Sequence, residues 1–413
     1  MTERHSADIA VVGGGVVGLT IALRLARAGR AVALVEPGVP GMGASFGNAG
    51  TIADYAVMPV GTPSVLRSLP SLLFDRDSPL AIRRAAILSL APWLLRFLRE
   101  SLPARASANA AAIATLVADA APLWRELAAE IGGEDLLRRN GALYVYDSPQ
   151  AVQAAQADMA ERRRLGVTVD LVDDATVARM EPRLPPAAGG AFFPGAVFLA
   201  DPGAMVARLA AAVAAAGVPQ IRARAERLDR GAQGVRLTGP GLDLTAARVV
   251  LAAGAHSRAL AVQAGDRVPL DTERGYHLEW DMAQPVLSRP CCPTTRGFYL
   301  CPMTGRLRVA GTVELGGLTA PPSRHRLARL EQGARAIFPG LGRPDREWMG
   351  FRPSMPDSLP VIGPSRAGAD VIHAYGHGHI GLTLAPATAR LVEGILTGNT
   401  PDRSLSPFRA DRF

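Results

Sequence analysis

Three glycines near the start of the chain have the spacing of a phosphate-binding turn. Gly13, Gly15 and Gly18 form a G-x-G-x-x-G pattern between an apolar run and a helical run. Gly13 permits a tight turn, Gly15 lets a pyrophosphate approach the backbone, and Gly18 allows close packing of helix on strand. Glu36 lies 23 residues after Gly13, where a carboxylate accepts hydrogen bonds from ribose and repels a 2′-phosphate. The pattern predicts a dinucleotide site that disfavours NADP.

Two later segments indicate which dinucleotide is bound. Residues 248–257 have the pattern of a late strand, after which Gly254 passes close to a cofactor, and Gly376, Gly378 and Gly381 open a helix. The N-terminus of such a helix stabilises negative charge on the pyrimidine ring of a reduced flavin. These contact segments are spread over roughly 370 residues, which suits an extended FAD better than a contiguous NAD domain.

The charged residues exclude several other functions. All 45 cationic residues are arginines, against 37 acidic residues, and the formal net charge is +8. Without lysine, the chain forms no Schiff base on a lysine and contains no P-loop. Because the arginines are scattered and aromatic residues make up only 5% of the chain, we expect no nucleic-acid partner.

The cysteines and the N-terminus indicate the compartment. Cys291, Cys292 and Cys301 have neither the spacing of zinc ligands nor that of a disulfide framework, so we expect no metal site and a reducing environment. The polar start runs directly into a strand, which is not typical of a signal peptide. We therefore expect a cytoplasmic protein.

These residues must be positioned by elements of two kinds. Residues 8–36 form a strand, helix and strand, residues 59–140 are mainly helical, residues 221–251 and 266–315 alternate as strands, and a final helix covers about 382–396. We predict an α/β plus α+β fold: a discontinuous, Rossmann-like FAD-binding domain with an inserted antiparallel-sheet substrate domain. The FAD-binding domain is expected at 1–60, 170–265 and 346–413, and the substrate domain at 61–169 and 266–345.

Six blocks of the sequence resemble one superfamily of flavoproteins. It is the D-amino-acid oxidase (glycine oxidase) superfamily, and within it the D-amino-acid dehydrogenase small subunits and their D-hydroxyproline dehydrogenase relatives. The glycine pattern alone is unspecific, whereas the fifth and sixth blocks are specific. In family order from residue 8 to 398, the blocks are DIAVVGGGVVGLTIALRLARAG, GASFGNAGTI, VVLAAGAHS, RGYHLEW, GFRPSMPDSLPVIG and GHGHIGLTLAPATARLVEGILTG.

The resemblance implies how FAD is held. Some relatives attach FAD to a cysteine that follows the T-x-E strand, but here the last cysteine, Cys301, precedes that strand, so we expect non-covalent FAD. Backbone and hydroxyl groups of three further segments are expected around it: Ser45, Asn48 and Gly50 at the pyrophosphate and isoalloxazine edge, Ala225 at the adenine, and Gly378, Gly381 and Thr383 at the pyrimidine ring.

The resemblance also implies a site for the carboxylate of an amino acid. Arg352 matches an arginine that holds this carboxylate by two parallel hydrogen bonds, which fixes the face of Cα that meets flavin N5. For His379, beside the flavin helix, packing and chemistry both stay open. Other expected contacts are a second hydroxyl from Tyr299, a cap from Tyr55 and a floor from Tyr276 and His277.

The expected reaction is oxidation of a D-amino acid, including D-proline or hydroxy-D-proline, with hydride transfer from Cα to flavin N5. One alternative is a glycine/sarcosine-type amine oxidase that uses oxygen; another is a flavin-binding subunit of a larger electron-transfer complex. In the sarcosine-oxidase branch a lysine near N5 assists oxygen attack. Since this chain has no lysine, we favour a dehydrogenase that passes electrons to a quinone or an electron-transfer partner.

Residues 79–102 leave two interpretations open. Their leucines, tryptophan and phenylalanine, with arginines at 83, 84, 96 and 99, are typical of a helix lying in a membrane interface. The same composition is found in a helix packed on its own domain. Under the first interpretation the protein is peripheral at the inner face of the plasma membrane.

Overall fold

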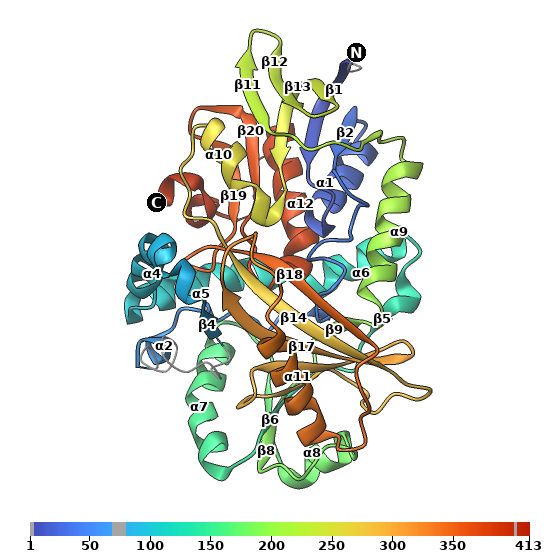
Figure 1. Ribbon diagram of the computed structural model, residues 1–413, viewed down its shortest axis with the longest axis vertical. Coiled ribbons are helices and arrows are strands. Elements are labelled where there is room, and N and C mark those ends of the chain that lie inside the picture. Colours follow the sequence, from blue (N-terminus) through green and yellow to red (C-terminus); the bar gives the residue numbers. More distant parts are fainter. Residues whose placement is uncertain (1–3, 68–79, 400–402) are drawn as a thin grey trace.

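The computed structural model describes residues 4–67, 80–399 and 403–413, and it has two halves (Figure 1). The upper half contains an eight-stranded sheet with β1 and β13 at its centre, and the lower half contains a nine-stranded sheet that includes β14 and β17. A sheet of three short strands lies apart from both. Its members are β3 (Thr51–Ile52), β5 (Leu137–Arg138) and β9 (Val197–Leu199).

The first half is built around the predicted strand, helix and strand. Alternate residues of the first strand enter different cores: Ile9 and Val11 pack beneath the helices, while Ala10 and Val12 pack on the opposite face. Burial of both faces explains the continuous apolar run in the sequence. The parallel strands and the helix of this unit are β1 (Arg4–Val12), α1 (Val16–Arg27), β2 (Val32–Val35) and β13 (Leu242–Leu251).

Distant segments complete this sheet and cover it. The predicted helix start at Asp201 is confirmed, since its carboxylate accepts a hydrogen bond from the Ala204 amide at 3.0 Å. Helix α1 contacts both α9 and α12 within one core. The added strands are β10 (Gln220–Ile221), β11 (Arg227–Gly231), β12 (Gly234–Gly239), β19 (Val361–Ser365) and β20 (Gly368–Tyr375), and the helices are α9 (Pro202–Ala215), α10 (Arg258–Gln263) and α12 (Gly381–Thr397).

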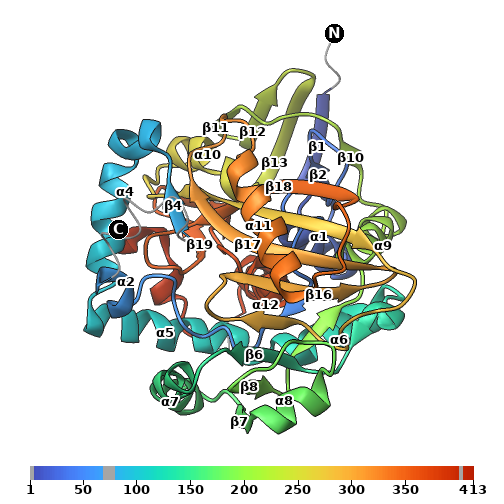
Figure 2. The ribbon, with the colours of Figure 1, turned by 60° about the horizontal axis from the view of Figure 1, so that its bottom comes forward.

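The second half is a mostly antiparallel sheet with α11 packed against it (Figure 2). Along the sheet the order is β18-β14-β17-β16-β15-β6-β8-β7, and β4 also pairs with β17. These strands are β4 (Leu80–Ile82), β6 (Ala142–Tyr146), β7 (Asp170–Asp173), β8 (Gly189–Phe193), β14 (Asp271–Asp281), β15 (Cys291–Pro293), β16 (Phe298–Met303), β17 (Arg306–Leu315) and β18 (Arg346–Ser354). The helices of this half are α7 (Pro149–Arg164), α8 (Asp174–Met180) and α11 (Arg324–Ile337).

One predicted domain boundary differs from the strand pairing. Residues 170–265 were expected in the FAD-binding domain, but β7 and β8 pair with each other and with β6 in the second sheet. The chain returns to the first half only with α9. Short strands of this kind have the same sequence pattern in either sheet, so their pattern did not reveal the partner. The remaining boundaries stay predictions.

Helices fill most of the region between residues 61 and 130. Together, α5 and α6 form a stretch that is long and apolar enough to cross a membrane, but half of its apolar window is buried inside the structure. There the indole of Trp124 donates a hydrogen bond to the Leu382 carbonyl at 2.8 Å, and core helices of globular domains share this composition. The helices are α2 (Pro63–Arg67), α4 (Ile87–Glu100), α5 (Pro103–Val117) and α6 (Ala120–Glu130).

Candidate active site

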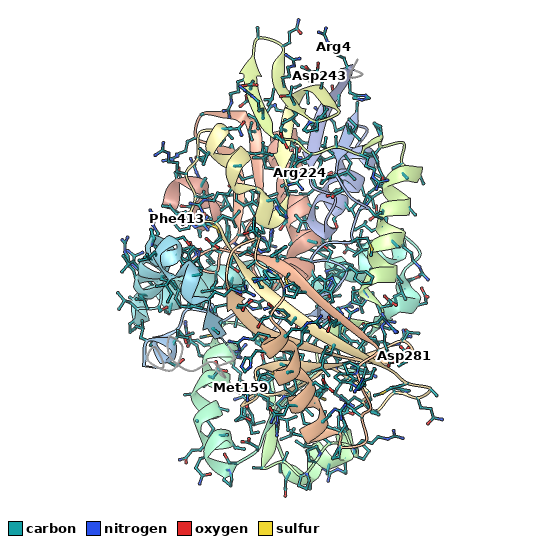
Figure 3. The ribbon with its side chains drawn as sticks, viewed as in Figure 1. Arg4, Met159, Arg224, Asp243, Asp281 and Phe413 are labelled. Atoms are coloured by element: carbon teal, nitrogen blue, oxygen red, sulfur yellow. The ribbon has the colours of Figure 1, made fainter. Side chains whose placement is uncertain are left out.

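A cavity of about 1690 Å³ is lined by residues of both halves. Its walls include the β1–α1 turn, the loop at 41–50, the start of α12 and the facing strands β14, β16, β17 and β18. Arg224, another lining residue, lies in the half that contains the eight-stranded sheet (Figure 3). Pockets for drug-sized ligands usually measure about 300–1,000 Å³, so this cavity has room for a large cofactor together with a small substrate.

The glycine turn has the geometry that its sequence predicted. Gly13 has a φ of +109°, and a Cβ added there would lie 2.5 Å from the carbonyl oxygen of Ala252. A Cβ on Gly18 would lie 1.9 Å from the carbonyl oxygen of Gly13, so the helix packs directly on the turn. Gly13 and Gly15 line the cavity, whereas Gly18 is not in its lining and serves the packing.

Glu36 directly follows β2 and lies at the wall of the cavity. Its carboxylate accepts hydrogen bonds from the Gly14 amide at 2.7 Å and from the Gly38 amide at 3.0 Å. A carboxylate has about four acceptor positions, so two such bonds fix its orientation and leave capacity for ribose hydroxyls. Ala225 and Gly254, from two other segments, line the same cavity.

The loop at 45–50 is held by its own side chains. The Ser45 hydroxyl accepts a hydrogen bond from the Val16 amide at 2.9 Å, in the first turn of α1. The Asn48 side-chain amide donates to the Ser45 carbonyl, and its oxygen accepts from the Gly50 amide at 2.6 Å. Asn48 therefore shapes the loop, while the loop as a whole lines the cavity.

The N-terminus of α12 also faces the cavity. Gly378 has a φ of +55°, and its amide donates to the Pro353 carbonyl at 2.7 Å. Gly381 is the first residue of the helix. The Thr383 hydroxyl accepts a hydrogen bond from the Ala53 amide at 3.0 Å, which ties the helix to the loop. The positive end of a helix dipole therefore borders the space that the glycine turn borders from the other side.

Arg352 faces this cavity from β18. The Nη1 group of its guanidinium donates a hydrogen bond to the Thr312 carbonyl at 3.3 Å. In the part of the chain that the structure describes, Arg352 forms no ion pair. Burial lowers the pKa of Arg352, and the charge of nearby Glu273 opposes that shift. A buried cation without a carboxylate partner is costly unless an anion binds it. Arg352 is thus a prepared site for an anionic group.

Three tyrosines form another wall of the cavity. The Tyr299 hydroxyl lies 3.1 Å from that of Tyr144 and 3.5 Å from that of Tyr55. The guanidinium of Arg162 lies 5.8 Å from the centre of the Tyr144 ring and donates to the Tyr55 carbonyl at 2.6 Å. Burial raises the pKa of Tyr55 and Tyr299 well above the usual value of 10, so these hydroxyls stay protonated.

Of the two residues on β14 that were expected to form the floor, Tyr276 lines the cavity, whereas the expected contact from His277 is wrong. The Tyr276 hydroxyl donates to Glu314 at 2.6 Å and accepts from the Ser323 amide at 3.1 Å, so it is engaged with protein groups. His277 is not in the lining of the cavity; it stacks on Trp348 with 5.0 Å between ring centres and bonds to the Gly47 carbonyl at 2.9 Å. Successive residues of a strand point to opposite faces, so the two cannot form one floor.

His379 is open to the cavity near Arg352. Burial among the cavity walls, together with the charge of Arg352, lowers its pKa to about 4. Burial likewise lowers the pKa of His377 to about 3, and its Nε2 lies 2.9 Å from the Thr388 hydroxyl. Both rings are therefore neutral at physiological pH. Over the described ranges no group of three His, Cys, Asp or Glu residues is arranged to hold a metal ion.

Several lining residues were not predicted from the sequence, among them Tyr144, Arg162, Thr312 and Trp348. The first two lie on elements far from any recognised block, and only the pairing of β6 with β15 brings Tyr144 to the site. Trp348 lies two residues before the GFRPSMPDSLPVIG block. A Cβ added to Gly47 would lie 2.3 Å from the Trp348 indole, and one added to Gly350 would lie 2.0 Å from it. Glycine at these two positions makes room for the indole, and this was the sequence signal that could have indicated Trp348.

These features define a class of protein: an oxidoreductase with a two-sheet dinucleotide-binding fold. Residues 8–394 match the family described as FAD dependent oxidoreductase (DAO), and the chain belongs to this family. The expected cofactor is thereby confirmed as FAD. The glycine turn, Glu36 and the start of α12 fit it, because they offer amides and a helix terminus to phosphates and a carboxylate to ribose.

Relatives extend over almost the whole chain. A D-amino-acid oxidase of Bradyrhizobium diazoefficiens is 35% identical over 422 residues, with 98% of each chain covered. A D-amino acid dehydrogenase of Rhodopseudomonas palustris is 30% identical over 423 residues, with 98% of this chain and 97% of the relative covered. The similarity to these two relatives agrees with the family assigned above.

Solved structures confirm the predicted fold. Glycine oxidase from Geobacillus kaustophilus matches with a TM-score of 0.79 at 24% identity, covering 99% of each chain. L-proline dehydrogenase from P. horikoshii matches with a TM-score of 0.75 at 18% identity, covering 100% of this chain and 98% of the other. At such identities the likeness concerns the fold alone.

Proposed function

We propose that the protein oxidises a D-amino acid at Cα and donates the electrons to an acceptor other than oxygen. The observation that carries the substrate class is Arg352, a cavity-facing guanidinium whose recorded bond is to a backbone carbonyl. Planar guanidinium groups bind carboxylates by two parallel hydrogen bonds. The names of the two relatives, a D-amino-acid oxidase and a D-amino acid dehydrogenase, support the same class.

Bound FAD accepts a hydride. Arg352 holds the substrate carboxylate and so fixes which hydrogen of Cα is presented. The Cα–H bond breaks as its electron pair leaves with the hydrogen, and the lone pair of the neutral amine forms the C=N bond. The imino acid then hydrolyses to a keto acid and ammonia, or stays cyclic if the substrate was a proline. Tyr55, Tyr144 and Tyr299 border the part of the cavity that is left for the substrate. Positioning of the substrate and exclusion of water accelerate the hydride transfer.

Anaerobic flavin reduction tests the substrate class. We expect bleaching of the flavin absorption by one or more D-amino acids, including D-proline and hydroxy-D-proline, and little by L- or N-methyl amino acids. Arg352→Lys should raise KM or the dissociation constant about 10- to 100-fold, because one point charge replaces a bidentate pair. Full turnover of Arg352→Ala at unchanged substrate dependence would overturn the proposal. Bleaching by no amino acid would favour an electron-transfer subunit instead.

Comparison of two acceptors tests the dehydrogenase assignment. The proposal is supported by the absence of lysine from the whole chain, because the sarcosine-oxidase branch uses a lysine near flavin N5 to assist oxygen attack. Turnover with a quinone analogue or an artificial dye should exceed turnover with air-saturated buffer by at least about tenfold. Equal rates would identify an oxidase of the glycine/sarcosine type.

The FAD is proposed to be non-covalent. Cys292 lines the cavity, but burial raises its pKa to about 12, and the nearby Arg162 opposes that shift only in part. A protonated thiol is a poor nucleophile. Acid precipitation should therefore leave the yellow colour in the supernatant, and colour retained in the pellet would contradict this.

A further inference from the structure

A β-bulge lies in β17 at the centre of the cavity wall. The pairing of β14 with β17 runs from Arg274–Glu314 on one side to Tyr276–Gly311 on the other, and the register shifts between them. Two residues of β17, Thr312 and Val313, therefore oppose the single residue Gly275. Bulges of this kind redirect side chains and are frequent beside active sites.

The register on the far side of the bulge is fixed by ionic and polar contacts. The Glu314 carboxylate accepts the Tyr276 hydroxyl at 2.6 Å and pairs with Arg274 at 3.1 Å. Arg83, from outside the sheet, also pairs with Glu314 at 3.1 Å. Sliding of β17 along β14 would break the contacts of Glu314 with Tyr276 and Arg274, which lie on β14, so the bulge is held in its place.

Thr312 has an unusual backbone conformation within this bulge. Its φ is +56°, in the left-handed region that β-branched residues rarely adopt. Thr312 lines the cavity and is only 7% exposed. Its hydroxyl has no hydrogen-bond partner among the described residues. Conformations of this kind persist where function uses the strain. A buried hydroxyl without a partner points to a missing ligand.

The same residue contacts Arg352. Its carbonyl accepts the hydrogen bond from Arg352 Nη1 at 3.3 Å. On the other side, a Cβ added to Gly275 would lie 2.5 Å from Arg352 Nη2, so the absence of a side chain at Gly275 makes room for the guanidinium. The bulge thus places the Thr312 carbonyl on the guanidinium of Arg352, and the same residue carries the hydroxyl without a partner.

We propose that Thr312 is a substrate-binding residue, whose hydroxyl donates a hydrogen bond to the carboxylate that Arg352 holds, while its carbonyl orients the guanidinium. The inference rests on the proposed function for the nature of the ligand. Its geometric basis is the left-handed bulge, the orphaned hydroxyl and the contact with Arg352. The ligand class is a carboxylate that carries its amino group on the adjacent carbon.

Binding of a simple carboxylate to the oxidised holoenzyme tests this without turnover. Benzoate or acetate is titrated while the flavin spectrum is recorded. Thr312→Val keeps the shape and removes the hydroxyl, and Thr312→Gly keeps the left-handed backbone and removes the side chain. Both should weaken binding about 10- to 100-fold, as expected for loss of a hydrogen bond to a charged group. Thr312→Ser restores the hydroxyl and should recover most of the affinity.

A matched control is Thr294→Val. Thr294 also lines the cavity, but its hydroxyl already donates to the Val145 carbonyl at 3.3 Å, so carboxylate binding should not change. Wild-type affinity in both Thr312→Val and Thr312→Gly would overturn the proposal. So would weak binding in Thr312→Val with wild-type affinity in Thr312→Gly, which would assign the effect to the backbone. Failure of D-amino acids to reduce the flavin, with the Thr312 dependence of carboxylate binding intact, would instead refute only the proposed reaction.

Discussion

His277 and His377 are buried beside the flavin site or its loop, His379 is open to the cavity, and desolvation by the surrounding protein lowers the pKa of all three. Their pKa values are lowered to about 4, about 3 and about 4. A lowered pKa means that the ring gains its proton only when the pH falls to that value, so none of the three changes charge between pH 5 and 8. These rings contribute packing and hydrogen bonds at working pH.

The pH dependence of kcat/KM should therefore follow the substrate. We expect one ascending limb whose apparent pKa tracks the amino group, because the neutral amine must supply the lone pair. Comparison of two D-amino acids with different amine pKa values shows whether the ascending limb comes from the substrate or from the enzyme. The limb should move with the substrate; a common inflection near pH 6.5 for both would show a titrating histidine.

Individual site residues could be predicted from the sequence where the backbone or a specific sequence block requires one residue type. Gly13 and Gly18 were identified because no other residue fits their contacts, and Arg352 because it lies in a specific block. Tyr276 and His277 were assigned to one surface although strand alternation separates them. Thr312 gave no signal, because a left-handed threonine in a bulge has the same sequence as an ordinary strand residue.

Helix α4 carries an exposed apolar stripe. Leu88 is 89% exposed and Leu95 is 68% exposed, and a spacing of seven residues places them on one face of the helix. Arg99 is also exposed, whereas Trp93 and Phe97 stack on each other at 5.3 Å and are buried. The helix lies at the periphery in Figures 1 and 2. Its aromatic face thus packs on the protein while its leucines face outward.

We infer that α4 docks on an anionic membrane surface. Sedimentation with phosphatidylglycerol vesicles at low salt should carry the wild-type protein down. Leu88→Ser/Leu95→Ser should weaken this at least about tenfold, since two leucines lose contact with acyl chains. Val262→Ser, at an exposed position on α10, is the matched control. Wild-type protein that stays in the supernatant would refute the docking.

Element prediction succeeded where amphipathic or doubly buried patterns were long. The strand at Ala142–Tyr146 and the helix that starts at Pro202 lie where the sequence indicated. The assignment of β7 and β8 to a sheet failed, because pairing partners are chosen by tertiary contacts that a short strand does not encode.

Asp266 joins distant parts of the molecule. It is fully buried, and it accepts hydrogen bonds from His373 Nε2 at 2.8 Å and from Arg366 Nε at 2.9 Å. Burial would raise the pKa of Asp266, but these hydrogen bonds outweigh it and lower the pKa to about 2. The loop between α10 and β14 is thereby fastened to β20 and to the turn before it.

Asp266→Asn should lower the free energy of unfolding by about 2–3 kcal/mol at pH 7, because charge-assisted hydrogen bonds become neutral ones. A lowered pKa stabilises above the unfolded-state value near 4, and the contribution is lost as the pH falls toward 2. Thermal or urea unfolding measures the difference in free energy of unfolding between wild type and Asp266→Asn. This difference should be the same at pH 7 and pH 5 and smaller at pH 3.5. A difference that does not depend on pH would refute the electrostatic origin.

The discontinuity of the molecule was itself predictable, since the glycine turn, the late strand and the C-terminal glycines lie far apart and must meet at one cofactor. What could not be predicted is how the second sheet closes the site, because β6, β16, β17 and β18 meet there only through long-range pairing.

The cavity draws its walls from Gly13 through Thr383, and this has a consequence for the life of the protein in a cell. A partial chain that lacks any of these segments presents an incomplete binding surface, so cofactor capture reports on completed folding. By mass action, FAD at 100 times its dissociation constant adds about 2.7 kcal/mol to the stability of the folded chain. We therefore expect flavin supply to influence the abundance of the protein as well as its catalysis, because chains without flavin are less stable and more open to proteases.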